Sequence, residues 1–292
     1  MYEESQDFWE TNLILRVLSG SRAYGLDDAD SDEDTRGICI PPREYLLGLQ
    51  TFEQHESEGN DHVVFALSKF VRLALQGNPN IIETLYTEGK NVLFINEPGR
   101  KLVENRDIFL SRRVGERFSS YAIAQLKRIE RHHRWIESPP EKAPSPDEYG
   151  AVQTEGRYSF PNLDAERAYQ SSMKHWTNYR IWRKNRNPAR AALEASYGYD
   201  TKHAMHLCRL LTMGQEILET GAVKVMRPDA EWLRGIRKGS MTYGELVEWS
   251  TEQESSLPGL VEQSVLPEEP DTAKAEELLI ELHYDFLIKG RV

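Results

Sequence analysis

The stretch of residues 13–36 limits the folds open to this chain more than any other, because an apolar run ends in a Gly-Ser turn and two spaced carboxylates follow. The run LILRVL reads as a strand, and Gly20-Ser21 ends it. Asp32 and Asp34 are separated by one residue, so in an extended strand both side chains leave the same face. Glycine lets backbone approach a phosphate, and carboxylates are ligands of Mg²⁺. The segment therefore predicts a site that holds a nucleoside triphosphate against Mg²⁺.

Two other interpretations of this acid-rich loop stay open. A chain with 47 Asp and Glu residues has many solvated acidic turns. A calcium loop of the EF-hand type would need Asp at alternate positions, then Gly, then Glu at the twelfth position, between two helices. The flanking segments 13–20 and 36–42 read as strands instead, which favours the nucleotide site.

Length and composition set wider limits. A chain of 292 residues can hold two domains of ordinary size. No apolar run approaches the roughly 20 residues of a membrane span, and the acidic N-terminus lacks the basic-then-apolar pattern of a signal peptide. Cys39 and Cys208 lie far apart inside apolar patterns, so we expect two buried thiols and no disulfide framework. These features predict a soluble, cytoplasmic protein without membrane contact.

The spacing of apolar residues divides the chain in two. Residues 1–112 read as α/β, with short β-rich runs and one helical segment at 68–86. Later apolar residues recur at three- and four-residue intervals in six segments: 113–137, 164–185, 200–221, 228–239, 242–253 and 272–290. The Pro- and Gly-rich connection 138–162 predicts a long, mobile loop. We therefore expect an α/β domain at 1–112 and a mostly helical domain at 113–292.

A third carboxylate on a strand beside the first two would help to hold a metal ion at a nucleoside triphosphate. Asp61 is the candidate, because Val63 and Phe65 alternate with it in the run 61–70. A strand start next to Asp32 and Asp34 would bring it within reach. Three preceding acids remain alternatives: Glu53, Glu56 and Glu58.

An acid-free segment, residues 173–192, interleaves cations with aromatic residues. Five residues spaced three and four apart would share one side of a helix: Trp176, Tyr179, Arg180, Arg183 and Arg186. Cations suit a phosphate backbone, and unstacked bases stack on aromatic rings, so this surface predicts a local RNA contact. The net charge of −11 argues against coating nucleic acid with the whole surface. The alternative is a helix with its aromatic residues in the core and its basic side in water.

The segment 201–210 places His203 and His206 three apart on a helix. A zinc pair is one interpretation, but no Cys or acid cluster nearby in the sequence completes four ligands. The favoured interpretation is a helix that packs on the α/β domain and presents Lys202, His203 or His206 to phosphate. A plain interdomain core is the remaining alternative.

These motifs resemble the signature of the DNA polymerase β-like nucleotidyltransferases: an apolar residue, Gly, Gly or Ser, about ten residues, then Asp-x-Asp. Glu33 and Thr35 stand where that superfamily usually has apolar residues. Longer segments resemble its bacterial and phage family associated with RNA repair. They are GSRAYG, SDEDTRGI, DHVVFALSKFVRLALQGNPNIIETLY, WRKNRNPARAALEASYGYDTKHAMHLCRLL and RPDAEWLRGIRKG. The stretch GYDTKHAMHL is far more specific than two acids.

The resemblance implies a catalytic palm, with a mixed sheet and helices, followed by a helical domain. It implies transfer of a nucleoside monophosphate from an NTP such as ATP to a hydroxyl, with the RNA 3′ end, tRNA-like, as acceptor. Asp32 and Asp34 would hold two Mg²⁺ (or Mn²⁺) ions and Asp61 the catalytic one. Gly20 and Ser21 would bind the triphosphate, and Arg22 would neutralise its charge.

Two rival functions remain open. The first keeps the chemistry and changes the acceptor, as in nucleotidyltransferase toxins and antitoxins that modify a protein or a tRNA. The second is a nonenzymatic NTP-binding regulatory module with the same fold, against which the intact Asp32 and Asp34 count. The NTP preferred and the oligomeric state are not set by the sequence.

Overall fold

A five-stranded mixed sheet forms the first part of the molecule, with strand order β3-β4-β2-β1-β5. The computed structural model describes residues 7–28 and 31–289, so the start of the acidic N-terminus lies outside the described residues. Strands β2 and β4 run parallel, whereas the other neighbouring strands are antiparallel. The strand bounds are β1 Leu13–Leu18, β2 Thr35–Cys39, β3 Gln54–Glu56, β4 His62–Ala66 and β5 Val92–Ile95.

Strand register brings four chain segments together at one end of the strands of this sheet. Leu18 at the end of β1 pairs with Thr35 at the start of β2, and Thr35 pairs with His62 at the start of β4. On the other side of β1, Val17 pairs with Val92 at the start of β5. The residues just outside these positions therefore converge, although they lie far apart in the sequence.

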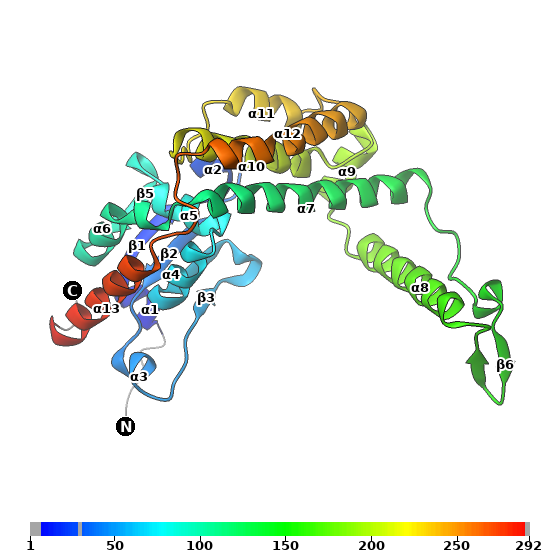
Figure 1. The fold of residues 1–292 in the computed structure, drawn as a ribbon, viewed down its shortest axis with the longest axis horizontal. Helices are drawn as coiled ribbons and strands as arrows, with labels where there is room; N and C mark the ends of the chain where they lie inside the picture. Colours follow the sequence, from blue (N-terminus) through cyan, green and yellow to red (C-terminus); the bar gives the residue numbers. More distant parts are fainter. Residues whose placement is uncertain (1–6, 29–30, 290–292) are drawn as a thin grey trace.

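Short helices surround the sheet, as Figure 1 shows. Helix α5 begins where the Asn78 side chain accepts a hydrogen bond from the N–H of Asn80, with Pro79 in the first turn. The C-terminal helix α13 returns to pack on α4 and η3. The bounds are α1 Phe8–Thr11, α2 Gly20–Tyr24, α3 Arg43–Leu46, η1 Glu58–Asn60, α4 Leu67–Leu75, α5 Pro79–Tyr86, η2 Gly89–Asn91, α6 Glu97–Glu104, η3 Arg106–Phe109 and α13 Thr272–Lys289.

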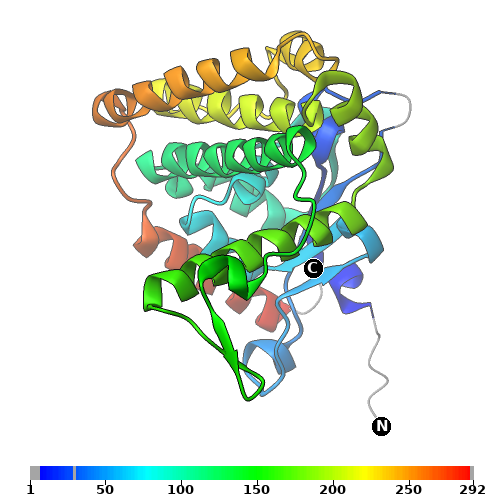
Figure 2. The ribbon, with the colours of Figure 1, turned by 90° about the vertical axis from the view of Figure 1, so that its right-hand side faces the viewer.

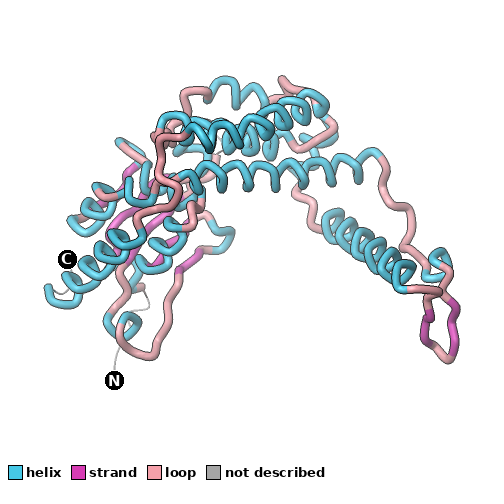
Figure 3. The backbone as a smooth tube through the Cα atoms, in the orientation of Figure 1, coloured by secondary structure: helices cyan, strands magenta, loops and turns pink. Residues whose placement is uncertain are grey.

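The helical part is built on the long helix α7, Arg112–Glu137, and on α10, Thr201–Thr220. These two helices approach closely because of glycine: a Cβ on Gly115 would lie 2.4 Å from Leu218 Cγ, and one on Gly214 would lie 3.1 Å from Gly115 O. Helices α11, Ala230–Arg237, and α12, Tyr243–Gln263, pack on α10. Helices make up most of the backbone of this part in Figure 3, as the three- and four-residue spacing of its apolar residues predicted.

An arm extends from the far end of α7. It contains η4, Pro146–Tyr149, the hairpin strands β6, Val152–Thr154, and β7, Arg157–Ser159, and helix α8, Leu163–Lys184. Figure 1 shows α8 and the hairpin standing away from the body of the molecule, and α9, Pro188–Tyr197, leading back toward α10; in Figure 2 the same arm faces the viewer in front of the body. The expected long loop at 138–162 therefore contains secondary structure, because its Gly-containing turn closes a small hairpin.

The buried core runs without interruption from the sheet into the helical part. One cluster of buried side chains contains Leu15 and Phe70 of the first part together with Leu207 and Met213 of α10. The mixed sheet followed by helices confirms the expected fold class. Cys39 and Cys208 are buried and unpaired, as expected. No helix in the described ranges combines the length and apolar character that crossing a membrane requires.

Candidate active site

Gly20 and Asp34 lie in contact at the edge of the sheet. Gly20 has a φ of +62°, and a Cβ there would lie 2.1 Å from Asp34 Oδ2, so no other residue fits without moving the carboxylate. The Ser19 N–H donates to the backbone oxygen of Asp34 at 2.8 Å. The Asp34 carboxylate is therefore held against the first residue of α2.

Asp32 and Asp34 precede the strand that was expected to contain them, because β2 begins at Thr35. The expected strand therefore does not include this pair, which sits in the connection that enters β2. Burial raises the pKa of Asp34, and the nearby Asp61 and Asp32 charges raise it further, while Arg36 opposes them. Asp32 and Asp61 thus each lie within electrostatic reach of Asp34.

Asp61 comes directly before β4, beside Asp34, as its position in the sequence predicted. Its backbone oxygen accepts from the Thr35 N–H at 2.8 Å and from Arg36 Nη1 at 3.0 Å. Thr35 Oγ1 and His62 Nδ1 lie 2.9 Å apart across the same strand pair. Among the alternative acids, Glu53 is engaged by Arg72 at 2.9 Å.

The three carboxylates are neighbours without forming a closed cage. Within residues 7–28 and 31–289, no three His, Cys, Asp or Glu side chains gather tightly enough to enclose a metal ion. Unneutralised carboxylates repel one another, and a cation between them would relieve that repulsion. All-oxygen donors fit a hard divalent cation better than zinc.

Arg22 ties the acidic loop to α2. Its Nε donates to the backbone oxygen of Asp32 at 3.3 Å, and its Nη2 donates to the backbone oxygen of Ser31 at 3.0 Å. Both bonds span about ten positions of sequence, so Arg22 fixes the path of the loop that carries Asp32. A guanidinium held in this way also places positive charge near the acids.

The beginning of α10 faces the carboxylates from the helical part. Lys202 acts electrostatically on Asp34, which places its ammonium near the sheet edge. The preceding Asp200 caps the helix and is bound by Arg190 Nη1 at 2.7 Å and His203 Nδ1 at 2.8 Å. Although burial raises the pKa of Asp200, these partners hold it well below its usual range. Burial lowers the pKa of His206 to about 3, so this ring is neutral at pH 7.

A buried ion pair joins the two parts of the molecule behind α2. Arg209 of α10 donates to Glu83 of α5, and Tyr24 O–H donates to the other Glu83 oxygen at 2.5 Å. The Arg209 guanidinium lies 3.7 Å from the centre of the Tyr24 ring. Sequence reasoning missed this group, although a single acid in the otherwise uncharged helix NPNIIETLY was a signal for it.

The basic segment 173–192 divides into a structural and an exposed set. Tyr179 is 5% exposed and packs among three tryptophans: Trp135, Trp176 and Trp182. Its placement therefore does not support contact with a base. Helix α8 ends at Lys184, so Arg186 does not share its face, and Arg186 instead pairs with the buried Glu194. Arg180 and Arg183 are exposed and form no ion pair with a described residue.

A family model described as "RNA repair pathway DNA polymerase beta family" matches residues 2–281. The chain belongs to this family. Membership of the RlaP family, which is associated with RNA repair, confirms the resemblance to the polymerase β-like superfamily stated from the sequence.

Two further relatives share shorter segments with this RlaP family member. An uncharacterized 38.9 kDa protein of Enterobacteria phage T4, from the nrdC-mobD intergenic region, is 27% identical over 109 residues, which cover 33% of this chain and 32% of the phage protein. The uncharacterized protein YcgL of Bacillus subtilis (strain 168) is 31% identical over 80 residues, 26% of this chain and 31% of YcgL. The chain thus aligns with about a third of each relative. No solved structure matches it significantly.

Proposed function

We propose that this protein transfers a nucleoside monophosphate from an NTP to a hydroxyl, with an RNA 3′ end as the acceptor. The observation that supports this most is the contact of Asp34 with Gly20, next to Asp32 and Asp61, at one edge of the sheet. In the reaction, the acceptor oxygen bonds to the α-phosphorus while the bond from that phosphorus to pyrophosphate breaks.

The carboxylates would hold Mg²⁺ or Mn²⁺, with Asp32 and Asp34 shared between two ions and Asp61 serving the catalytic one. When bound, such ions stabilise the charge on the attacking and leaving oxygens. Asp61 is the residue we assign to accept the proton of the attacking hydroxyl. Gly20 and Ser21 admit the triphosphate through backbone N–H groups, since Gly20 offers no Cβ to exclude it.

Cations from both parts of the molecule would balance the phosphates. Arg22 lies at the loop of Asp32, and Lys202 faces Asp34 from α10. His203 and His206 follow Lys202 in the same helix, where His206 is neutral and serves as a hydrogen-bond partner for phosphate. Because these residues come from a different part of the chain, closure of the site depends on the packing of α10 against α2.

We propose that the RNA strand reaches this site along α8. Arg180 and Arg183 are exposed there, and neither is neutralised by an acid in the described part of the chain. Trp176 is half-buried, so part of this residue stays accessible. We further propose residues 1–112 as the catalytic domain, residues 113–292 as the helical domain, and the cytoplasm as the location, with ATP among the NTPs used.

The test is incubation of the protein with each labelled NTP, Mg²⁺ and total RNA, followed by separation of labelled RNA, labelled protein and free nucleotide. We expect label on RNA that depends on Mg²⁺ and is lost in the double variant Asp32→Asn, Asp34→Asn. Label on protein instead would favour a toxin- or antitoxin-type enzyme. NTP binding without transfer to any acceptor would overturn the enzyme and favour a regulatory module.

A further inference from the structure

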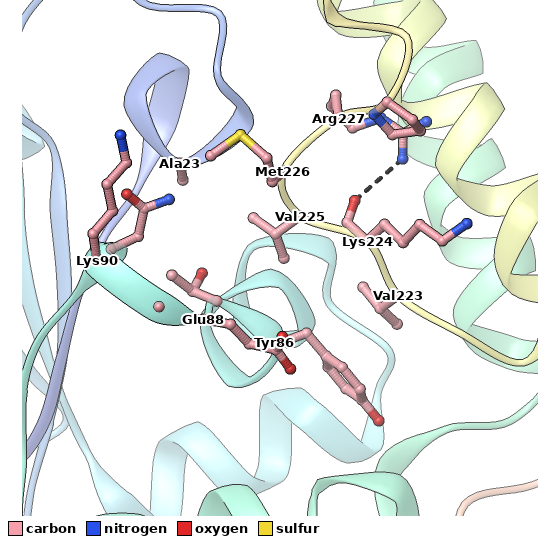
Figure 4. A pocket seen from close by; sticks show the side chains of 13 residues that line it. Ala23, Tyr86, Glu88, Lys90, Val223, Lys224, Val225, Met226 and Arg227 are labelled. Carbon is pink, nitrogen blue, oxygen red and sulfur yellow. Dashed lines mark hydrogen bonds between the residues drawn. The ribbon is translucent and has the colours of Figure 1, made fainter.

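A cavity of about 490 Å³ opens beside α2, as Figure 4 shows. Its walls come from three segments of the chain: Ala23 of α2, residues 86–91 between α5 and β5, and residues 223–228 after α10. A volume of this size accommodates a ligand as large as a nucleotide.

The cavity is separate from the carboxylate site. Strand register places the start of β5 on one side of the β1 end and the start of β2 on the other. Residues 89–91 precede β5 and line the cavity, whereas Asp34 precedes β2. None of the three acids is among the lining residues, so the two sites share α2 and no side chain of the acid group.

The wall formed by residues 223–228 is fixed in place. Arg227 is 5% exposed, and it binds Glu216 through Nη1 and Asp229 through Nε, both at 2.8 Å. The Arg227 N–H donates to the backbone oxygen of Tyr24 at 3.1 Å. Met226 packs against Gly25, where a Cβ would lie 2.6 Å from the methionine sulfur. The cavity is therefore preformed rather than a gap in a loose loop.

Its lining combines cations with apolar side chains. Lys90 is exposed and forms no ion pair with any residue of the described ranges, whereas Glu88 is engaged by Arg106 at 2.6 Å and Lys224 by Glu216 at 2.7 Å. Arg227 is likewise paired, with Glu216 and Asp229, so Lys90 is the lining cation that is left to meet an anion. Apolar groups complete the wall: Ala23, Val223, Val225 and Met226.

We propose that this cavity binds a nucleoside phosphate as a second ligand, distinct from the NTP held at the carboxylates. The base packs against Val225 and Met226, and the phosphate meets the ammonium of Lys90. A ligand here touches α2 through Ala23, on the helix that begins with Gly20. Binding of this ligand therefore affects the position of Gly20-Ser21 at the start of α2.

The test is photo-crosslinking of the full chain with 8-azido-ATP, followed by mapping of the modified peptides. We expect one labelled region at residues 86–91 or 223–228, in addition to any label near the carboxylates. Val225→Trp fills the cavity and Lys90→Glu reverses its charge, so each should lower labelling of that region at least tenfold. Lys127→Glu, at an exposed lysine of α7 away from the cavity, is the matched control and should change nothing.

Competition separates nucleoside recognition from simple anion binding. AMP should displace the label from these peptides, and displacement by pyrophosphate but not by AMP would overturn the assignment. Absence of label there at millimolar probe, or full labelling in both Val225→Trp and Lys90→Glu, would also overturn it. These outcomes are independent of transfer to RNA, because that reaction is scored in a separate assay with unmodified NTP.

Discussion

Two charged clusters flank α2, and they differ in how their charges are neutralised. At the sheet edge, Asp34 is partly buried beside Asp32 and Asp61, and it forms no ion pair with a described residue. Behind α2, Glu83 is buried and is bound by both Arg209 and Tyr24. A partly buried acid that forms no ion pair costs stability, which makes Asp34 a candidate for function, whereas the closed pair holds two parts of the chain together.

The largest effect on activity is expected from removing Asp34, the acid without an ion pair among the described residues. Asp34→Ala should lower Mg²⁺-dependent transfer by about 1000-fold or more, because a lost metal ligand removes several kcal/mol of transition-state stabilisation. The fold should remain intact by circular dichroism. Asp27→Ala, an exposed acid of the same loop, is the control and should keep its activity. Near-normal turnover in Asp34→Ala would remove Asp34 from the site.

Asp61→Asn should lose activity about as severely as Asp34→Asn and still bind NTP, because the ion on the triphosphate keeps other ligands. The measurement is transfer rate together with equilibrium binding of a labelled NTP. Retained transfer in Asp61→Asn with loss in Glu53→Gln would move the role of third acid to Glu53.

Breaking the buried cluster of Glu83, Arg209 and Tyr24 should instead lower the free energy of unfolding. Glu83→Gln leaves the Arg209 charge buried and unpaired, and should lower the free energy of unfolding by about 3–5 kcal/mol. The exposed pair offers a matched control, since Glu88→Gln beside Arg106 should cost at most about 1 kcal/mol. Denaturant titration measures both. The double variant Glu83→Leu, Arg209→Met should recover much of the loss, and equal costs for Glu83→Gln and Glu88→Gln would contradict the assigned role.

A smaller, pH-dependent effect is expected where α7 meets the arm. Burial lowers the pKa of His132 to about 4, and its ring stacks on Trp135. The unfolded chain takes up this proton near pH 6.5 and the folded chain does not, so stability is full above pH 6.5 and falls as the pH drops toward 4. His132→Gln should remove about 1–2 kcal/mol of the stability loss between pH 7 and 5. Unchanged pH dependence in this variant would show that His132 titrates normally.

The smallest effects are expected on the exposed arm. Arg180→Ala or Arg183→Ala should weaken RNA binding at every sequence and lower the slope of log affinity against log salt by roughly 0.7–1, as for one phosphate contact. Arg100→Ala on α6 is the control. Unchanged affinity and salt dependence in both arm variants would make α8 a scaffold. Tyr179→Ala should lower the free energy of unfolding, because the Tyr179 ring is buried. It should not weaken stacking with a base.

Much of the fold followed from local patterns. The runs at β1, β2 and β4 and the long helices were predicted from the spacing of apolar residues, and the Gly20-Ser21 turn from the residue types themselves. The prediction failed where a neighbour in space decided the outcome. Asp32 and Asp34 lie before β2 because pairing with Leu18 begins only at Thr35. Arg186 does not lie on the expected basic face of the helix, because Glu194, eight residues later, binds it.

The sequence by itself predicted which residues would carry chemistry: a glycine that accepts a positive φ, two acids one residue apart, and a third acid at a strand entry. Only the tertiary structure decided which charged side chains form ion pairs and which do not. Glu83 and Arg209 are 126 positions apart, and Ala23 meets residues 86–91 and 223–228 only at the cavity beside α2. Helix and strand patterns arise from interactions within a few residues, whereas ion pairs and cavities depend on how distant elements pack.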